Sequence, residues 1–218
     1  MNKYFLILTL FLFACSDSSD DSSDMNDPNN GSDGQLVNLF FSEYAEGSSG
    51  FNKYVEIYNP SSSSVNLSNY QIKGTNNGTT WGDNGARELT LTGTIDANSV
   101  YIICADAADQ AILDKANLAL PYESPVHYNG NDAVAIFGID SSGNYTVILD
   151  VIGVQSSDPG PAGWNVAGET GATKDHTLVR KSSISKGNSN WENSSGTSTS
   201  NSEWEVKDID DWTSLGSR

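Results

Sequence analysis

Three tryptophans in loops rich in Gly and Asn are the residues of this chain whose surroundings best suit ligand binding. They are Trp81 in TTWGDNG, Trp164 in PAGWNVAG and Trp191 in NSNWENS. An exposed indole ring can stack on the apolar face of a sugar, whereas an indole that folds back covers an end of the core or anchors its loop. The sequence leaves both interpretations open, and the functional one is carbohydrate binding.

Two groups of oxygen-bearing side chains indicate a second chemistry, the binding of calcium. One group is Asn129, Asn131 and Asp132 in YNGNDA, and the other is Asp208, Asp210 and Asp211 in DIDD. Ca²⁺ prefers such hard oxygen ligands, but neither group has the spacing of an EF-hand loop. Turn residues that bond their own backbone explain the same composition. We therefore expect no cofactor, with calcium as the alternative.

The groups needed for catalysis are sparse. The nucleophile pattern G-x-S-x-G is absent. His176 follows Asp175, but neighbours on a strand point to opposite faces, so the pair does not form a base and its orienting acid. His127 lies in a separate loop, and the two histidines with Cys104 lack the ligand spacing of a zinc site. We expect a protein that is not an enzyme and has no metal centre.

The N-terminus has the features of a secretory signal. Lys3 precedes the apolar run from Tyr4 to Ala14, which is shorter than the roughly 20 residues that a membrane-spanning helix needs. The last residues, LFAC, resemble the lipobox of bacterial lipoproteins, in which the cysteine is acylated after cleavage. This resemblance implies that residues 1–14 are a signal peptide and that Cys15 carries the lipid. An ordinary secretory signal that contains a cysteine is the alternative.

An acidic segment follows the cysteine. Residues 16–34 contain six aspartates, no Lys or Arg, and Met25 as nearly the only apolar side chain, so they cannot bury enough surface to fold. We expect residues 15–34 to be a disordered tether. The segment resembles the export tract that directs lipoproteins of Bacteroidetes-type bacteria to the outer face of the outer membrane; a generic linker is the alternative. The expected localisation is thus the outer membrane, lipid-anchored through Cys15 and exposed at the cell surface.

The charge of the chain excludes one class of partner. The formal net charge is −17 at pH 7, and removal of residues 1–14 takes away Lys3 and leaves 10 basic against 28 acidic residues, or −18. Nucleic acid binding requires a basic surface, so we expect no nucleic acid partner. With Cys15 acylated, Cys104 has no thiol with which to form a disulfide. Residues 35–218 are long enough for one domain with a sizeable core.

Short β-strands separated by turn residues dominate this domain. In KYVEIYNP, for example, Val55 and Ile57 share one face of the predicted strand. About nine such segments occur, at residues 36–44, 53–60, 65–73, 88–95, 99–105, 132–139, 145–153, 176–181 and 203–207. Only residues 106–116 have helical character. The pattern predicts an all-β sandwich.

Two pairs of motifs stand out among these segments: YVEIYNP followed by VNLSNYQI, and GNDAVAI followed by VILDVIG. Over most of residues 36–154, the sequence resembles one known family, the lamin tail domain as found in bacterial secreted proteins. This resemblance implies an immunoglobulin-like β-sandwich and an accessory or interaction module. We expect a non-catalytic cell-surface lipoprotein that displays this module to a protein partner, for adhesion or scaffolding. A carbohydrate-binding sandwich and an accessory to a secreted hydrolase or nuclease are the alternatives.

Overall fold

The computed structural model describes residues 36–81 and 87–218. The predicted signal peptide at residues 1–14 and the predicted tether at residues 15–34 lie outside this range. Within the range, no helix is both long and apolar enough to span a bilayer.

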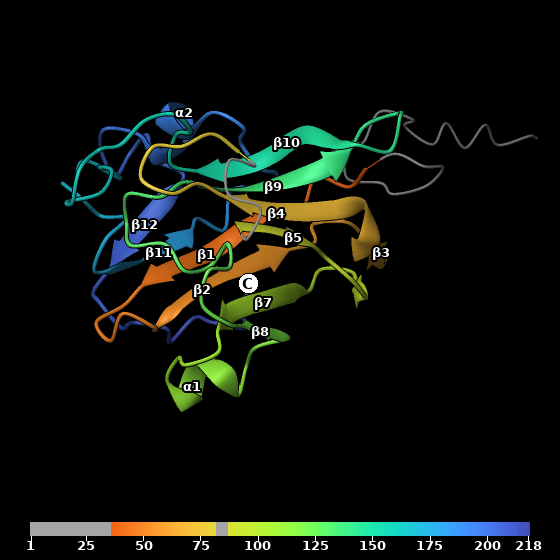
Figure 1. Cartoon of the computed structure of the whole chain (residues 1–218), viewed down its shortest axis with the longest axis horizontal. Helices are drawn as coiled ribbons and strands as arrows, with labels where there is room; N and C mark the ends of the chain where they lie inside the picture. Colours follow the sequence, from red (N-terminus) through yellow and green to blue (C-terminus); the bar gives the residue numbers. More distant parts are fainter. Residues whose placement is uncertain (1–35, 82–86) are drawn as a thin grey trace, which may run out of the picture.

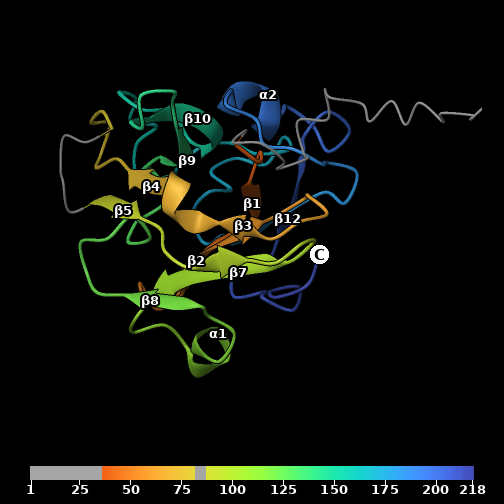
Figure 2. The ribbon, with the colours of Figure 1, turned by 90° about the vertical axis from the view of Figure 1, so that its right-hand side faces the viewer.

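The described chain folds into two main β-sheets that face each other (Figure 1; Figure 2 gives the perpendicular view). A six-stranded sheet has the order β12-β11-β1-β2-β7-β8, a four-stranded sheet has the order β10-β9-β4-β5, and β3 pairs with β6. The strand pairs are antiparallel except β7 with β8. The strands are β1 (Phe40–Glu46), β2 (Lys53–Tyr58), β3 (Val65–Asn66), β4 (Tyr70–Gly74), β5 (Glu88–Thr90), β6 (Thr94–Ile95), β7 (Val100–Ala105), β8 (Leu118–Leu120), β9 (Val134–Ile139), β10 (Tyr145–Ile152), β11 (His176–Arg180) and β12 (Trp204–Lys207).

Each of the nine predicted segments contains a strand, which confirms the all-β sandwich. Residues 65–73 hold two strands, because the Asn66 side chain accepts a hydrogen bond from the Ser68 amide and caps the 3₁₀ turn Leu67–Asn69 between them. The short parallel strand β8 was not predicted. The predicted helix at residues 106–116 is reduced to the single turn α1 (Gln110–Leu113), and α2 (Trp191–Ser195) was not predicted.

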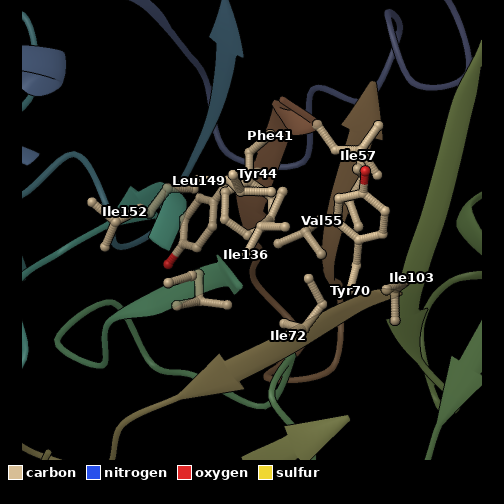
Figure 3. Close-up of a cluster of buried hydrophobic side chains, with 14 of the residues drawn as sticks. Phe41, Tyr44, Val55, Ile57, Tyr70, Ile72, Ile103, Ile136, Leu149 and Ile152 are labelled. Atoms are coloured by element: carbon tan, nitrogen blue, oxygen red, sulfur yellow. The ribbon is translucent and has the colours of Figure 1, made fainter. Parts of the chain in front are cut away.

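The core lies between the two sheets (Figure 3). The six-stranded sheet contributes Val55 and Ile57, as the strand pattern predicted, and the four-stranded sheet contributes Ile72 and Ile136. Alternating residues of each strand point into this layer. Burial of these apolar side chains is the main source of stability in a domain in which Cys104, the cysteine within the described ranges, is free and buried.

The opposite face of the six-stranded sheet is covered as well. Tyr54 of β2 and Cys104 of β7 pack there against Ile112 of α1 and Leu215 near the C-terminus. Strand β2 is therefore buried on both faces, that of Val55 and Ile57 and that of Tyr54 and Glu56. The sequence pattern could not reveal this second layer, because the segments that cover β2 come from distant parts of the chain.

Long connections meet at one end of the sandwich, at the left in Figure 1. Because the main strands are antiparallel, the connections after β1 (residues 47–52), β4 (75–81 of the described chain), β8 (121–133) and β10 (153–175) all leave from that end, and β12 ends there too. We call it the loop end. The described chain begins at the other end, where Leu36 packs closely on Gly138. A Cβ atom added to Gly138 would lie 2.5 Å from Leu36 Cδ1.

Candidate functional site

Two of the three tryptophans singled out in the sequence line one pocket. Trp81 and Trp191 face a cavity of about 370 Å³ beside β10, the edge strand of the four-stranded sheet. Apolar side chains of β10 and Val154 form part of its wall, and Gln155, Asn190 and Glu192 add polar groups. The pocket thus combines aromatic, aliphatic and hydrogen-bonding groups, as small-molecule sites do.

Local contacts hold the two indoles in place. The Trp81 amide donates to Gln155 Oε1 at 3.3 Å, and its ring meets the Phe137 ring of β9 edge-on, with centroids 5.7 Å apart. Trp191 begins helix α2, which Asn190 caps by accepting a hydrogen bond from the Asn193 amide. Trp191 is 4% exposed and also packs on Trp204. Trp191 is therefore mainly a core residue, and only a small part of its ring faces the pocket.

The third tryptophan lies next to this pocket. Gly153, which lines the pocket, has φ +82°, and a Cβ atom added to it would lie 2.7 Å from Cζ3 of Trp164. Trp164 therefore packs directly on the backbone at Gly153. Three segments that are separate in the sequence thus bring their tryptophans to one region of the structure.

The first group of calcium candidates is engaged in protein contacts. Asp132 Oδ1 accepts from the Asn77 amide at 2.7 Å, and Asp132 Oδ2 lies 3.5 Å from Arg87 Nη1. Asn131 Nδ2 donates to Asn77 Oδ1 and to Asp158 Oδ1. Asn129 belongs to the same connection, after β8. These contacts fasten the loops of the loop end to one another.

The second group of calcium candidates fastens the C-terminal segment. Asp210 Oδ1 accepts from the Ser48 amide at 3.1 Å, and Asp210 Oδ2 accepts from Ser48 Oγ at 2.5 Å. The Asp208 carbonyl accepts from the Asp211 amide at 3.2 Å in a turn. Across residues 36–81 and 87–218, three or more His, Cys, Asp or Glu side chains do not come together as a metal site.

The two histidines occupy different settings. His127 is 6% exposed, its Nδ1 lies 2.8 Å from Ser124 Oγ, and burial lowers the pKa of its ring. The backbone bond from the His127 amide to the Ser124 carbonyl shows that the two residues close one turn. His176 Nδ1 lies 2.6 Å from the Lys174 carbonyl, and its Nε2 lies 3.1 Å from Glu169 Oε1. Both histidines thus make local contacts, His127 within a loop and His176 at the start of β11.

Sequence reasoning missed an exposed aromatic pair at the loop end. Phe51 is 43% exposed and Tyr122 is 72% exposed, and both rings meet the His127 ring edge-on, at centroid distances of 6.4 Å and 5.6 Å. Large rings inside the turn-rich stretches SSGFN and PYESP were the signal that could have revealed them. Exposed apolar rings that gather in one place are typical of interaction surfaces.

The sequence of the sandwich matches a known protein family. The family model of the lamin tail domain matches residues 34–155, more than half of the chain. The chain belongs to the lamin tail domain family. This match confirms the family resemblance and agrees with the immunoglobulin-like sandwich of the structure. The lamin tail domain is a non-enzymatic, immunoglobulin-like fold, which suits an interaction module.

Solved structures include proteins that are similar to this chain. No curated protein matches the chain. Among solved structures, a DUF4876 family protein from Bacteroides thetaiotaomicron is similar, with a TM-score of 0.48 and 14% sequence identity, over 83% of this chain and 73% of that chain.

The lamin tail domain match ends before several of the features described above. Its residues 34–155 contain β1 to β10 and Trp81, whereas β11, α2 and β12 follow it. Trp164 and Trp191 also belong to this C-terminal segment. The pocket beside β10 is therefore built jointly by the lamin tail domain and the segment that follows it.

Proposed function

We propose that this lamin tail domain protein is a non-catalytic, lipid-anchored interaction module that presents its loop end to a protein partner at the cell surface. The observation that carries the proposal is the distribution of exposed apolar side chains. Within the described ranges, five large hydrophobic residues are exposed, and Phe51, Tyr122, Val154 and Ile209 belong to segments of the loop end. Ile209 joins them because its neighbour Asp210 bonds to Ser48 in the connection after β1.

The direction of the chain suits such display. The described chain begins at the end of the sandwich opposite the loop end, in the red-orange part of Figure 1. A tether on Cys15 would join the domain at that end, so the loop end would point away from the membrane. The net charge of −17 further favours a partner other than nucleic acid.

The binding surface can be tested by site-specific crosslinking on intact cells. A photoreactive phenylalanine analogue replaces Tyr122 at the loop end in one variant, and Val147, which is 40% exposed near the start of β10, in a matched control. We expect a protein adduct from position 122 and none from position 147. Mass spectrometry of the adduct would distinguish an adhesion partner from a secreted hydrolase or nuclease. Equal yields at both positions, or none at either, contradict the proposal.

The anchor is tested separately. We expect the chain to incorporate labelled fatty acid and to be digested by protease added to intact cells, and we expect Cys15→Ser to abolish the labelling and release the protein from membranes. Labelling that persists in Cys15→Ser, or protection from the protease, would contradict the lipid anchor or the surface location, respectively.

A further inference from the structure

We infer that the pocket between Trp81 and Trp191 binds a single uncharged sugar ring. This inference does not depend on the protein partner of the loop end, because it concerns a different ligand and a separate pocket. Val154 is the residue that this pocket shares with the exposed side chains of the loop end. The pocket lies beside β10, at the junction of the lamin tail domain and the C-terminal segment.

The size of the pocket suits a small ligand. Its volume of about 370 Å³ lies near the lower limit of the roughly 300–1,000 Å³ that is usual for small-molecule sites. A pocket of this size beside an edge strand can enclose one ring of a glycan chain while its neighbours stay in solvent. An extended protein segment would instead require a groove.

The side chains around the pocket match the two kinds of surface that a sugar presents. Trp81 and Val154 offer apolar surface for the C–H face of a ring, and Gln155, Asn190 and Glu192 offer donors and acceptors for its hydroxyl groups.

Charge restricts the class of sugar. Among the described residues that line the pocket there is no Lys or Arg, and Glu192 contributes a carboxylate. The whole chain is also strongly acidic. An anionic sugar would meet repulsion without a cation to offset it, so neutral hexoses and N-acetylhexosamines are the expected ligands.

Saturation-transfer NMR on the purified full chain tests this inference. The probes are the methyl glycosides of glucose, galactose, mannose and N-acetylglucosamine, with methyl glucuronide as the anionic comparison. We expect transfer to at least one neutral glycoside and none to the glucuronide. Absence of transfer to all four neutral glycosides, or transfer to the glucuronide alone, would overturn the inference.

Variants locate the binding. Trp81→Ala should weaken affinity about tenfold through loss of stacking, and Glu192→Ala should weaken it while its matched control, Glu205→Ala on β12, should not. Because Trp81→Ala also removes a ring packed on Phe137, a second variant blocks the pocket without removing core contacts. This variant is Val154→Arg, which changes a 36%-exposed side chain. Unchanged binding in both Glu192→Ala and Val154→Arg, with thermal unfolding like that of the parent, would place any sugar elsewhere.

Discussion

Asp150 of β10 and Arg180 of β11 form a buried ion pair that joins the two sheets. Both side chains are fully buried, and Arg180 Nη2 lies 2.5 Å from each carboxylate oxygen. Asp150 also accepts from the amides of Phe41 and Asn188, and Arg180 stacks over the Trp204 ring. The pair connects the lamin tail domain to the segment that follows it, because Asp150 belongs to the first and Arg180 to the second.

Removal of one partner of this pair should strongly destabilise the fold. Asp150→Ala removes the fully buried partner of Arg180, which keeps its ion pair with Glu203, and it leaves two backbone amides without their acceptor. We therefore expect the free energy of unfolding to fall by about 3 kcal/mol. Urea denaturation measures this change in the free energy of unfolding. The control is Glu205→Ala, which breaks the exposed pair of Glu205 with Lys207 and should cost less than about 1 kcal/mol. Similar small losses in both variants would show that the buried pair does not hold the sheets together.

A second buried acidic feature lies under the C-terminus, on the outer face of the six-stranded sheet. Glu43 and Glu56 are opposite each other on β1 and β2 and are both buried. Ser214 Oγ donates to Glu43 Oε2, and the Gly216 amide donates to Glu56 Oε2, each at 2.6 Å. Burial raises the pKa of Glu43 to about 7, and repulsion from Glu56 adds to this shift.

This raised pKa predicts that the protein loses stability as the pH rises. The folded state holds the Glu43 proton up to about pH 7, whereas the unfolded chain releases it near the usual value of 4.5. The folded state therefore binds more protons between these values, and stability falls through this window by about 3 kcal/mol. Glu43→Gln should remove most of this slope and stabilise the protein at about pH 8. Urea titrations across the window test it, and an unchanged slope in Glu43→Gln would contradict the assignment.

The Cys104 thiol should be unreactive in the folded protein. It is fully buried, and burial raises its pKa to about 11, so little thiolate is present at neutral pH. In a Cys15→Ser chain, we expect a disulfide reagent to modify Cys104 only when urea unfolds the protein. Rapid modification without urea would show that the layer over β7 opens readily.

Gly153 should tolerate no side chain. Its φ of +82° disfavours other residues, and the Trp164 ring occupies the space of a Cβ atom. We expect Gly153→Ala to lower the free energy of unfolding by about 1–3 kcal/mol and to change Trp fluorescence. Gly143→Ala is the control, because Gly143 also has positive φ but has open space around it. An equal loss in both variants would assign the effect to backbone strain alone.

Sequence reasoning predicted the strands well and the surroundings of their side chains less well. Around Val55, apolar and polar residues alternate, and around Ile136 apolar residues follow one another between turn residues. Both patterns are local signals of a strand. The burial of Glu56 was not visible, because it depends on residues 214–218 that fold over β2. The tryptophans were singled out as unusual residues of Gly- and Asn-rich segments, but nothing in the sequence indicated that Trp81 and Trp191 line one pocket, since that depends on how two distant segments pack.

The sequence by itself determined the strand pattern, the family and the acidic charge, because each of these depends on local composition and motifs. Only the tertiary structure decided that Asp150 pairs with Arg180, that Glu43 and Glu56 are buried together, and that Phe51 and Tyr122 stay exposed at the loop end. The physical reason is that burial and pairing are properties of surfaces brought together by the fold. A residue's own neighbours in the sequence do not determine which distant segment will cover it.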